Sequence, residues 1–318
     1  MRATHFNIRA ARWLSAVGVL VDTAELEIFR AVANERSVIR AARSLDRVPS
    51  NVTTRIQHLE EELGAPLFLR QNKRMELTPE GQRFLLYTER ILATAEEARQ
   101  SLRQDVPQGT LRIGSMESTA ASRLPRPLMA FHAENPLVKL EVTTGTTDAL
   151  VNGVLERRLD CAIVAHPYEG PHSKISWDEE YPELEGTYLF TERLMLVAPV
   201  GFRKGQRRQG ATSIRTVAAF SKGCVYRKCA EEWIASQTGM SKSESWSILD
   251  VSSYYAILAC VASGSAVGFL PQSVLDLSTE RPPLETAFVR PAHSFLVRRK
   301  GFETPAYRAF AEAMHRRN

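Results

Sequence analysis

Cysteine is scarce in this chain of 318 residues, which contains only four. Cys161, Cys224, Cys229 and Cys260 are too scattered for the disulfide framework of a small secreted protein. The seven histidines are dispersed as well, and no cysteine–histidine cluster has the spacing of a zinc site. We therefore expect no bound metal, no cofactor and no disulfide framework.

Long apolar runs are also missing, because no stretch reaches the length of a transmembrane helix. Residues 1–21 carry three arginines and then an apolar run, an order that resembles a short signal peptide, yet no small-residue cleavage site follows. We expect residues 1–21 to be an extension outside the folded domains. The net charge of +5 is modestly basic and permits a nucleic-acid partner. We expect a cytoplasmic protein.

The most informative part of the chain is the segment 37–63, which predicts two short helices joined by a tight turn. The first helix has apolar residues at the spacing i, i+3, i+4 and i+7 behind a serine that suits the N-cap, namely Val38, Ala41, Ala42 and Leu45 behind Ser37. After the turn 46–48, Pro49 suits the first position of the second helix. The apolar face of that helix is formed by Val52, Ile56, Leu59 and Leu63.

The outer face of the second helix carries groups suited to DNA. Hydroxyl and amide groups can bond to base edges, and arginine suits guanine or phosphate. In a helix-turn-helix, a second helix of this kind lies in the major groove. The residues of this segment that we expect to contact DNA are Arg47, Ser50, Asn51, Thr53, Thr54, Arg55 and His58.

The alternative is a pair of core helices with an ordinary solvated face. Local charge argues against this alternative, because six arginines face only two acidic residues between positions 30 and 55. A basic stretch beside a helix pair is typical of phosphate binding.

A small basic hairpin follows the helix pair. The segments 67–70 and 75–77 flank a polar, basic tip, after a helix stop at Gly64. A basic hairpin beside a recognition helix is typical of a wing, which suits phosphate or the minor groove. The expected contacts from the wing are Arg70, Lys73 and Arg74.

Residues 78–102 predict a long helix with a narrow apolar seam. Phe84, Ile91 and Ala98 recur every seven residues, and Ala95 and Leu102 form a second row. Such a seam is usually buried against another helix, and nothing nearby in the sequence offers one. We therefore expect a second subunit to cover it.

Beyond a linker at residues 104–109, strands alternate with helices. This alternation predicts an α/β domain with largely parallel sheets. The expected helices are 127–132, 148–158 and 254–263, and the expected strands are 111–114, 138–142, 161–165, 194–198, 248–251 and 267–270.

Taken together, these segments resemble the LysR-type transcriptional regulators from Asp22 to the C-terminus. The matching segments are 25–33, 41–45, 59–70 and 77–81 in the first part and 111–115, 159–164 and 267–271 in the second. Segments 114–121 and 223–227 are similar to a subgroup named for a sulfur-oxidation regulator.

The resemblance implies an α/β chain with an α-rich N-terminal part. That part is a winged helix-turn-helix followed by a long linker helix that pairs subunits. It is followed by a two-lobed, periplasmic-binding-protein-like effector domain in which two crossover strands join the lobes and an inducer binds between them. The expected partners are double-stranded promoter DNA, a small-molecule effector and RNA polymerase, and the expected assembly is a homodimer or a homotetramer.

The domains expected on this basis are the extension (1–21), the DNA-binding domain (22–80), the linker helix (81–105) and the effector-binding domain (106–318). Within the last, lobe I is expected at about 110–190 and 270–300, and lobe II at about 191–269.

The chain departs from the family pattern at three places. Val48 stands where the family usually has a serine, and the loss of a capping hydroxyl typically costs about 1 kcal/mol, which Pro49 offsets in part. The family's glycine-rich segment before the last crossover strand is here Gly264-Ser265-Ala266, in which we expect Ala266 to narrow the backbone freedom of the turn, and residues 1–21 have no counterpart in the family.

Inducer-binding residues are expected beyond the carboxyl ends of strands, near helix N-termini. Backbone N–H groups and hydroxyls there favour a non-covalent inducer that is a carboxylate or similar anion, and Glu117, which would repel an anion, is expected to face away. The same residue types also serve as ordinary turn and cap residues. The expected ligand-binding residues are Ser115, Ser118, Thr119, Thr146, His166, Tyr226 and Arg227.

Two alternatives to a ligand-responsive regulator remain open. An enzyme or a transport-type binding protein could use the α/β part, but no catalytic triad or phosphate loop stands out, and residues 22–105 would be unexplained, so we expect no enzyme. A thiol-based redox regulator could use Cys224 and Cys229, because Arg227 or Lys228 could lower a thiol pKa.

Overall fold

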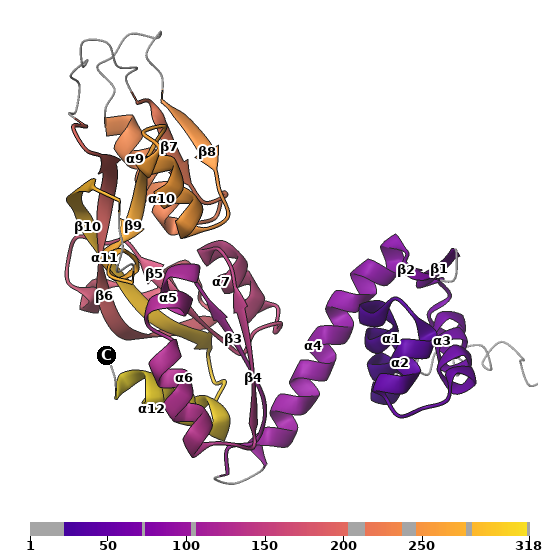
Figure 1. Ribbon diagram of the computed structural model, residues 1–318. Coiled ribbons are helices and arrows are strands. Elements are labelled where there is room, and N and C mark those ends of the chain that lie inside the picture. The colour runs from indigo at the N-terminus through magenta and orange to yellow at the C-terminus, as the bar shows by residue number, and fades with distance from the viewer. Residues whose placement is uncertain are drawn as a thin grey trace, which may run out of the picture. The chain divides into compact units, whose positions relative to one another are not determined.

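The computed structural model describes residues 22–71, 74–102, 106–202, 214–236, 246–277 and 282–316 (Figure 1). Contacts divide the chain into two units, one ending at Ala95 and the other beginning at Glu96. The boundary falls inside the long helix α4 (Pro79–Ser101). The expected extension at residues 1–21 lies outside the described residues.

The first unit consists of short helices and a hairpin, as the sequence predicts. Its further elements are α1 (Thr23–Glu35), α2 (Val38–Ser44), α3 (Pro49–Leu63), β1 (Phe68–Gln71) and β2 (Arg74–Leu77). The Ser37 side chain caps α2 by accepting from the Arg40 N–H. At α3 the N-cap is Val48, whose side chain makes no capping bond, and the helix ends at Gly64 with a positive φ of 65°.

The apolar faces of these helices meet in one core. The fully buried members include Phe29, Val32, Ala41, Val52, Ile56 and Leu59. Burying one such large side chain contributes about 1.5–3 kcal/mol relative to leaving it exposed. This burial fixes which face of α3 remains outside the core.

The second unit contains an eight-stranded sheet, counted over the residues that the structure describes. The strand order is β4-β3-β5-β10-β6-β9-β7-β8. The strands are β3 (Gly109–Ser115), β4 (Val138–Thr144), β5 (Cys161–His166), β6 (Leu184–Pro199), β7 (Thr216–Ala219), β8 (Ser247–Asp250), β9 (Val267–Pro271) and β10 (Leu284–Arg299).

Parallel pairs occur at both ends of this sheet, and antiparallel pairs at its centre. The strand β3 runs parallel to β4 and β5, and β7 runs parallel to β8 and β9. The strands β6 and β10, each 16 residues long, run antiparallel to one another along almost their whole length. They connect the two ends of the sheet, as crossover strands do. The sequence places the last crossover strand directly after Ala266, where the structure has the short strand β9 instead. The antiparallel pairing of β6 and β10 makes the sheet less parallel than the strand–helix alternation predicts.

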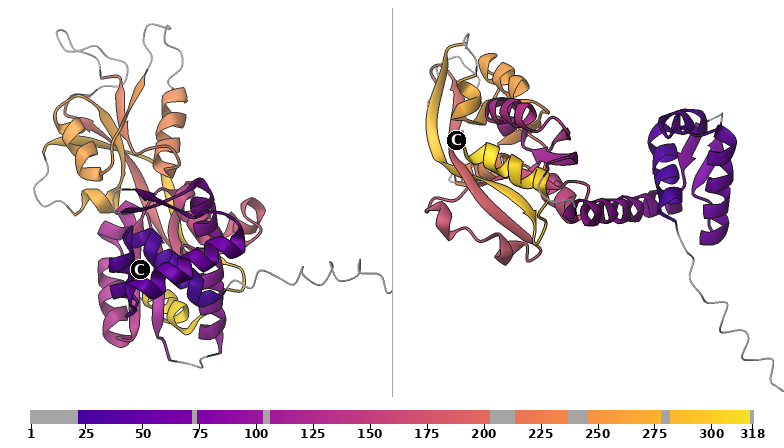
Figure 2. Two further views of the ribbon diagram at one scale, coloured as in Figure 1. Left: turned by 90° about the vertical axis from the view of Figure 1, so that its right-hand side faces the viewer. Right: turned by 90° about the horizontal axis from the view of Figure 1, so that it is seen from below.

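Helices cover both ends of the sheet. They are α5 (Glu117–Ser122), α6 (Pro125–Glu134), α7 (Thr147–Leu155), α8 (Trp177–Glu180), α9 (Val225–Ser236), α10 (Tyr254–Ala262), α11 (Gln272–Leu275) and α12 (Pro305–His315), with a short 3-10 helix at His172–Lys174. Figures 1 and 2 show α12 beside α6. We call β3–β5 with α5–α7 and α12 lobe I, and β7–β9 with α9 and α10 lobe II. None of the described helices is both long and apolar enough to span a membrane.

Candidate DNA-binding face and effector pocket

The face of α3 opposite its core contacts is polar and open to solvent. Ser50, Asn51, Thr54, Arg55 and His58 are exposed, Thr53 is half-buried, and Arg47 in the preceding turn is exposed. The hydroxyls of Thr53 and Thr54 donate to backbone oxygens one turn earlier, at 3.0 Å each. Both hydroxyl oxygens can still accept hydrogen bonds.

An acidic residue of α1 holds two of these side chains. Glu25 is only 2% exposed, and its Oε1 accepts from Arg55 Nη1 at 3.1 Å and lies 3.0 Å from His58 Nδ1. The sequence interpretation gave Glu25 no role. The signal was present, because Glu25 precedes Ile28, Phe29 and Val32 at the i+3, i+4 and i+7 spacing and so lies on the core face of α1.

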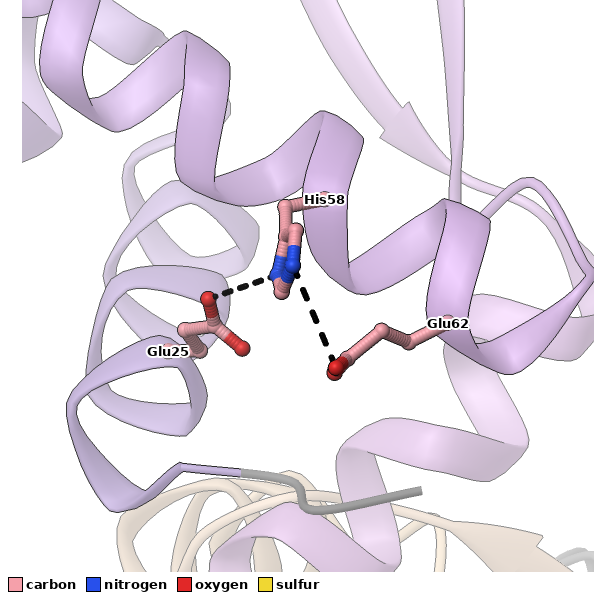
Figure 3. A group of neighbouring side chains, drawn as sticks. All are labelled: Glu25, His58 and Glu62. Atoms are coloured by element: carbon pink, nitrogen blue, oxygen red, sulfur yellow. Dashed lines mark hydrogen bonds and ion pairs between the residues drawn. The ribbon is translucent and has the colours of Figure 1, made fainter. Parts of the chain in front are cut away.

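The same cluster offers groups that could ligate a metal. Figure 3 shows the His58 ring between the carboxylates of Glu25 and Glu62, and the ligand atoms of the three residues lie within 4.8 Å of one another. However, the two ring nitrogens face different carboxylates, since Nε2 lies 3.9 Å from Glu62 Oε1. A metal ion would also meet the Arg55 guanidinium on the same Glu25 oxygen. The arrangement fits an ion-pair network that orients Arg55 and His58 better than a metal site.

The hairpin has the register expected of a wing. In its antiparallel pairing, Gln71 lies opposite Arg74 at the tip end, and Arg74 is exposed. Lys73 and the side chain of Arg70 lie outside the described residues, so their expected contacts stay predictions.

A pocket of about 740 Å³ lies between the lobes, within the range of about 300–1,000 Å³ that is usual for ligand sites. Lobe I contributes the residues around the carboxyl ends of β3 and β4, namely Met116, Glu117, Thr144, Gly145, Thr146 and Thr147. The opposite wall is formed by Phe220, Ser221, Cys224, Tyr226, Asp250, Val251, Ser252, Tyr254 and Ala256.

Two carboxylates belong to this pocket. Glu117 lines it, which corrects the expectation that this side chain faces away. Burial raises the pKa of the Glu117 carboxyl, and a hydrogen bond from the backbone N–H of Tyr254 opposes the rise. Because Tyr254 is the first residue of α10, this hydrogen bond joins the two lobes. The second carboxylate, Asp250, is paired with the Arg227 guanidinium.

A buried hydroxyl group lies behind the pocket. Ser118 is 2% exposed, and its Oγ has no partner within ordinary hydrogen-bond range among the described atoms. Burial raises the pKa of Tyr226 and of Tyr254, and the nearby Ser118 hydroxyl opposes the rise in both. The three hydroxyls therefore lie close together, two of them on residues that line the pocket.

The structure separates the seven expected ligand-binding residues. Only Thr146 and Tyr226 line the pocket, and Thr146 also caps α7 by accepting from the Ala149 N–H. Ser115, Ser118 and Thr119 are buried in lobe I. His166 and Arg227 line a neighbouring pocket of about 510 Å³. Their roles in binding stay predictions.

Several pocket residues escaped the sequence interpretation. Phe220 follows β7 directly, Asp250 ends β8, and Tyr254 begins α10. Applied to the observed strands, the rule that ligands bind beyond the carboxyl ends of strands finds the first two. The sequence predicts no strand at β7, so the rule has no starting point for Phe220, and the sequence places Asp250 inside the predicted strand 248–251 rather than at its end.

The cysteines near the pocket have the properties of unreactive thiols. Burial raises the pKa of Cys224, although the backbone N–H groups of Arg227 and Tyr226 and the Arg227 charge act in the opposite direction. Burial also raises the pKa of Cys229, to about 11. Since the thiolate is the reactive form, these environments argue against a redox switch.

The chain joins two parts. One is a winged helix-turn-helix with an exposed polar helix, and the other is a two-lobed α/β domain with a pocket between its lobes. This combination defines a DNA-binding regulator with a ligand-binding domain. Residues 23–82 match the model of the bacterial regulatory helix-turn-helix protein of the lysR family, and residues 104–318 match the LysR substrate binding domain. The chain belongs to the LysR family of DNA-binding transcriptional regulators, which carry a C-terminal effector-binding domain. This is a family of regulators rather than enzymes.

Curated relatives are similar over most of their length. The uncharacterized regulator YusT of Bacillus subtilis is 32% identical over 92% of this chain and 95% of its own length. GltR of the same organism is 32% identical over 91% of this chain and 94% of its own length. CzcR of Bacillus thuringiensis subsp. konkukian is 34% identical over 80% of this chain and 82% of its own length.

Solved structures share the fold. A full-length OxyR variant from Pseudomonas aeruginosa matches with a TM-score of 0.64 and 20% identity, covering 93% of this chain and 98% of that one. Full-length CbnR complexed with its target DNA matches with a TM-score of 0.59 and 24% identity, covering 94% of this chain and 100% of that one.

Proposed function

We propose that this chain is a homo-oligomeric transcription factor whose α3 contacts promoter DNA, and whose activity is set by a small molecule held without covalent bonds in the pocket between the lobes. The observation that carries the proposal is the exposed polar face of α3, which lies opposite a face fixed in the core. In this proposal the protein acts in the cytoplasm, requires no cofactor, catalyses no reaction and works with RNA polymerase.

Two observations support the DNA and oligomer parts of the proposal. CbnR, which shares this fold, has been solved with its target DNA. On α4, the apolar residues Tyr87, Ile91 and Leu102 are exposed at 61%, 45% and 83%, and they leave an apolar stripe that a second subunit would cover.

The pocket supports the regulatory part of the proposal. Its walls come from both lobes, so a ligand bound there contacts both and can favour one arrangement of the lobes over another. A ligand shifts such an equilibrium only by its difference in affinity for the two arrangements.

Fluorescence anisotropy with the DNA upstream of the protein's own gene, compared with a shuffled duplex of the same composition, tests the proposal. We expect the upstream DNA to bind at least tenfold more tightly, and we expect Thr54→Ala combined with Arg55→Ala to abolish that preference. Gln82→Ala, an exposed change on α4, serves as the control. Equal affinity for the two duplexes, or an unchanged preference in the double variant, would contradict the proposal.

A further inference from the structure

We propose that the pocket between the lobes takes a small organic cation, an amine that also carries a hydrogen-bonding group such as a hydroxyl. This inference rests on the proposed function and names the chemical class of its effector. It assigns a charge opposite to the one favoured by the sequence, which drew attention to the serine, threonine and helix-terminal groups of lobe I.

The charged side chains of the pocket wall are all acidic. Glu117 and Asp250 line it, and no lysine or arginine does so among the residues that the structure describes. The basic residues Lys222, Arg227 and Lys228 line the neighbouring pocket instead. The Arg227 guanidinium is already bonded to Asp250, Glu231 and the Phe220 carbonyl. An anion entering the pocket would meet two carboxylates and would find no lysine or arginine to pair with among the described residues of the pocket wall.

The helix ends that would ordinarily attract an anion are also occupied. At α10, the N–H of Tyr254 is bonded to Glu117, and the N–H of Ala256 donates to Ser253 Oγ at 3.1 Å. At α7, the N–H of Asp148 donates to the Gly223 carbonyl at 3.3 Å, and the N–H of Ala149 donates to Thr146 Oγ at 3.4 Å. The positive end of α10 thus already faces a carboxylate of the protein, which makes it less able to attract an anion.

Aromatic residues complete the site. The rings of Phe220, Tyr226 and Tyr254 line the pocket, and those of Phe220 and Tyr254 meet edge to face at 4.8 Å. Faces of aromatic rings attract organic cations. The hydroxyls of Tyr226 and Tyr254, two residues that line the pocket, can bond to a polar group of the ligand, and the buried Ser118 Oγ lies behind them.

Isothermal titration calorimetry of the full-length protein tests the inference with sets of compounds of similar skeleton whose terminal group is cationic, neutral or anionic. One set is tyramine, 4-hydroxyphenylethanol and 3-(4-hydroxyphenyl)propionate, and the other is 5-aminopentanol, pentane-1,5-diol and 5-hydroxypentanoate. In at least one set, we expect the amine to bind at least tenfold more tightly than the carboxylate. Equal binding, tighter binding of the carboxylates, or no binding by any of the six compounds would overturn the inference.

Variants of the carboxylates locate the effect. We expect Glu117→Gln and Asp250→Asn each to weaken amine binding at least fivefold and to leave carboxylate binding equal or stronger. The matched control is Glu312→Gln, an exposed change on α12 outside the pocket. Amine binding unchanged in both pocket variants would also overturn the inference, and the second variant keeps the test decisive if the first does not fold.

DNA binding is measured in the same preparations. If upstream DNA is bound specifically but no amine is preferred, this inference fails and the proposed function stands. If specific DNA binding itself is missing, the proposed function fails first.

Discussion

The Glu25 carboxylate and the Arg55 guanidinium form an ion pair of 3.1 Å that joins the core face of α1 to the exposed polar face of α3. Glu25 is 2% exposed, whereas the Arg55 side chain is 46% exposed. The guanidinium is therefore held on one side by a buried carboxylate and remains open to solvent on the other.

We expect Glu25→Gln to reduce discrimination between the target DNA and a shuffled duplex by several-fold. The neutral amide still fills the site, but it holds Arg55 and His58 with weaker hydrogen bonds, since charge-assisted bonds are about twice as strong as neutral ones. The opening free energy of α1 and α3, followed by hydrogen exchange, should fall by about 1–2 kcal/mol. Glu27→Gln, an exposed change on the same helix, is the control. A Glu25 variant with unchanged discrimination would show that the ion pair does not position Arg55.

The helix-turn-helix could be predicted closely because its signals are local. The Ser37 cap, the Pro49 start, the Gly64 end and the apolar spacing of α3 all lie within a few residues of the structures that they specify. The contact of Glu25 with Arg55 was not found, because it joins residues 30 positions apart and depends on how α1 packs against α3.

The effector domain was harder to predict because its centre depends on distant pairing. The strand β10 pairs with both β5 and β6, and its register shifts near Phe288 and near Ser294. Its residues 292–297 are all buried, and a stretch buried on both faces lacks the regular alternation by which strands are recognised. Only 194–198 was predicted from the whole of β6, and Glu117 was placed outside a pocket that exists only when both lobes are present.

The missing cap of α3 can be restored. Val48 has extended backbone angles of φ −83° and ψ 143°, which suit a capping side chain. We expect Val48→Ser to raise the opening free energy of α3 by about 0.5–1 kcal/mol, measured by hydrogen exchange in the full-length protein. Ser37→Ala, which removes the existing cap of α2, should lower the corresponding value by about 1 kcal/mol. If hydrogen exchange in α3 is unchanged in the Val48→Ser variant, a capping side chain adds nothing and Pro49 alone fixes the start of the helix.

Affinity for DNA should depend steeply on salt. If a dimer neutralises about ten phosphates, the logarithm of affinity should fall against the logarithm of salt concentration with a slope of roughly −9. Arg74 at the hairpin tip is exposed, and in a dimer Arg74→Ala should make the slope shallower by about two, since each lost phosphate contact changes it by about one. Anisotropy titrations between 50 and 300 mM salt measure both values. A flat response would contradict phosphate binding by this domain.

The thiols near the pocket should react slowly with peroxide and iodoacetamide at neutral pH. A raised pKa keeps the thiol protonated, so reactivity should increase as the pH rises toward that pKa. With a pKa of about 11, Cys229 carries roughly one thiolate in a thousand molecules at pH 8. Mass spectrometry of alkylation between pH 7 and 10, with N-acetylcysteine as the reference thiol, measures this dependence. Loss of DNA binding in peroxide that Cys224→Ser prevents would instead support the redox alternative.

The apolar stripe on α4 should hold two subunits together. Tyr87, Ile91, Ala95, Ala98 and Leu102 follow one another at helical spacing and are all exposed, whereas Phe84, expected in the same seam, is half-buried against the core of the first unit. Covering this stripe removes apolar surface from water, so a charge placed in it should oppose association. We expect Ile91→Asp to raise the dimer dissociation constant at least tenfold in sedimentation velocity measurements.

A matched control separates this effect from a general effect of charge. Gln82 is exposed and lies nine residues before Ile91, which places it on the opposite side of the helix at 100° per residue. Gln82→Asp adds the same charge to the same helix and should leave the dimer intact. Because two linked DNA-binding domains address two half-sites together, Ile91→Asp should also weaken binding to the full DNA site more than binding to one half-site. Equal dissociation constants in the two variants would show that the subunits associate through another surface.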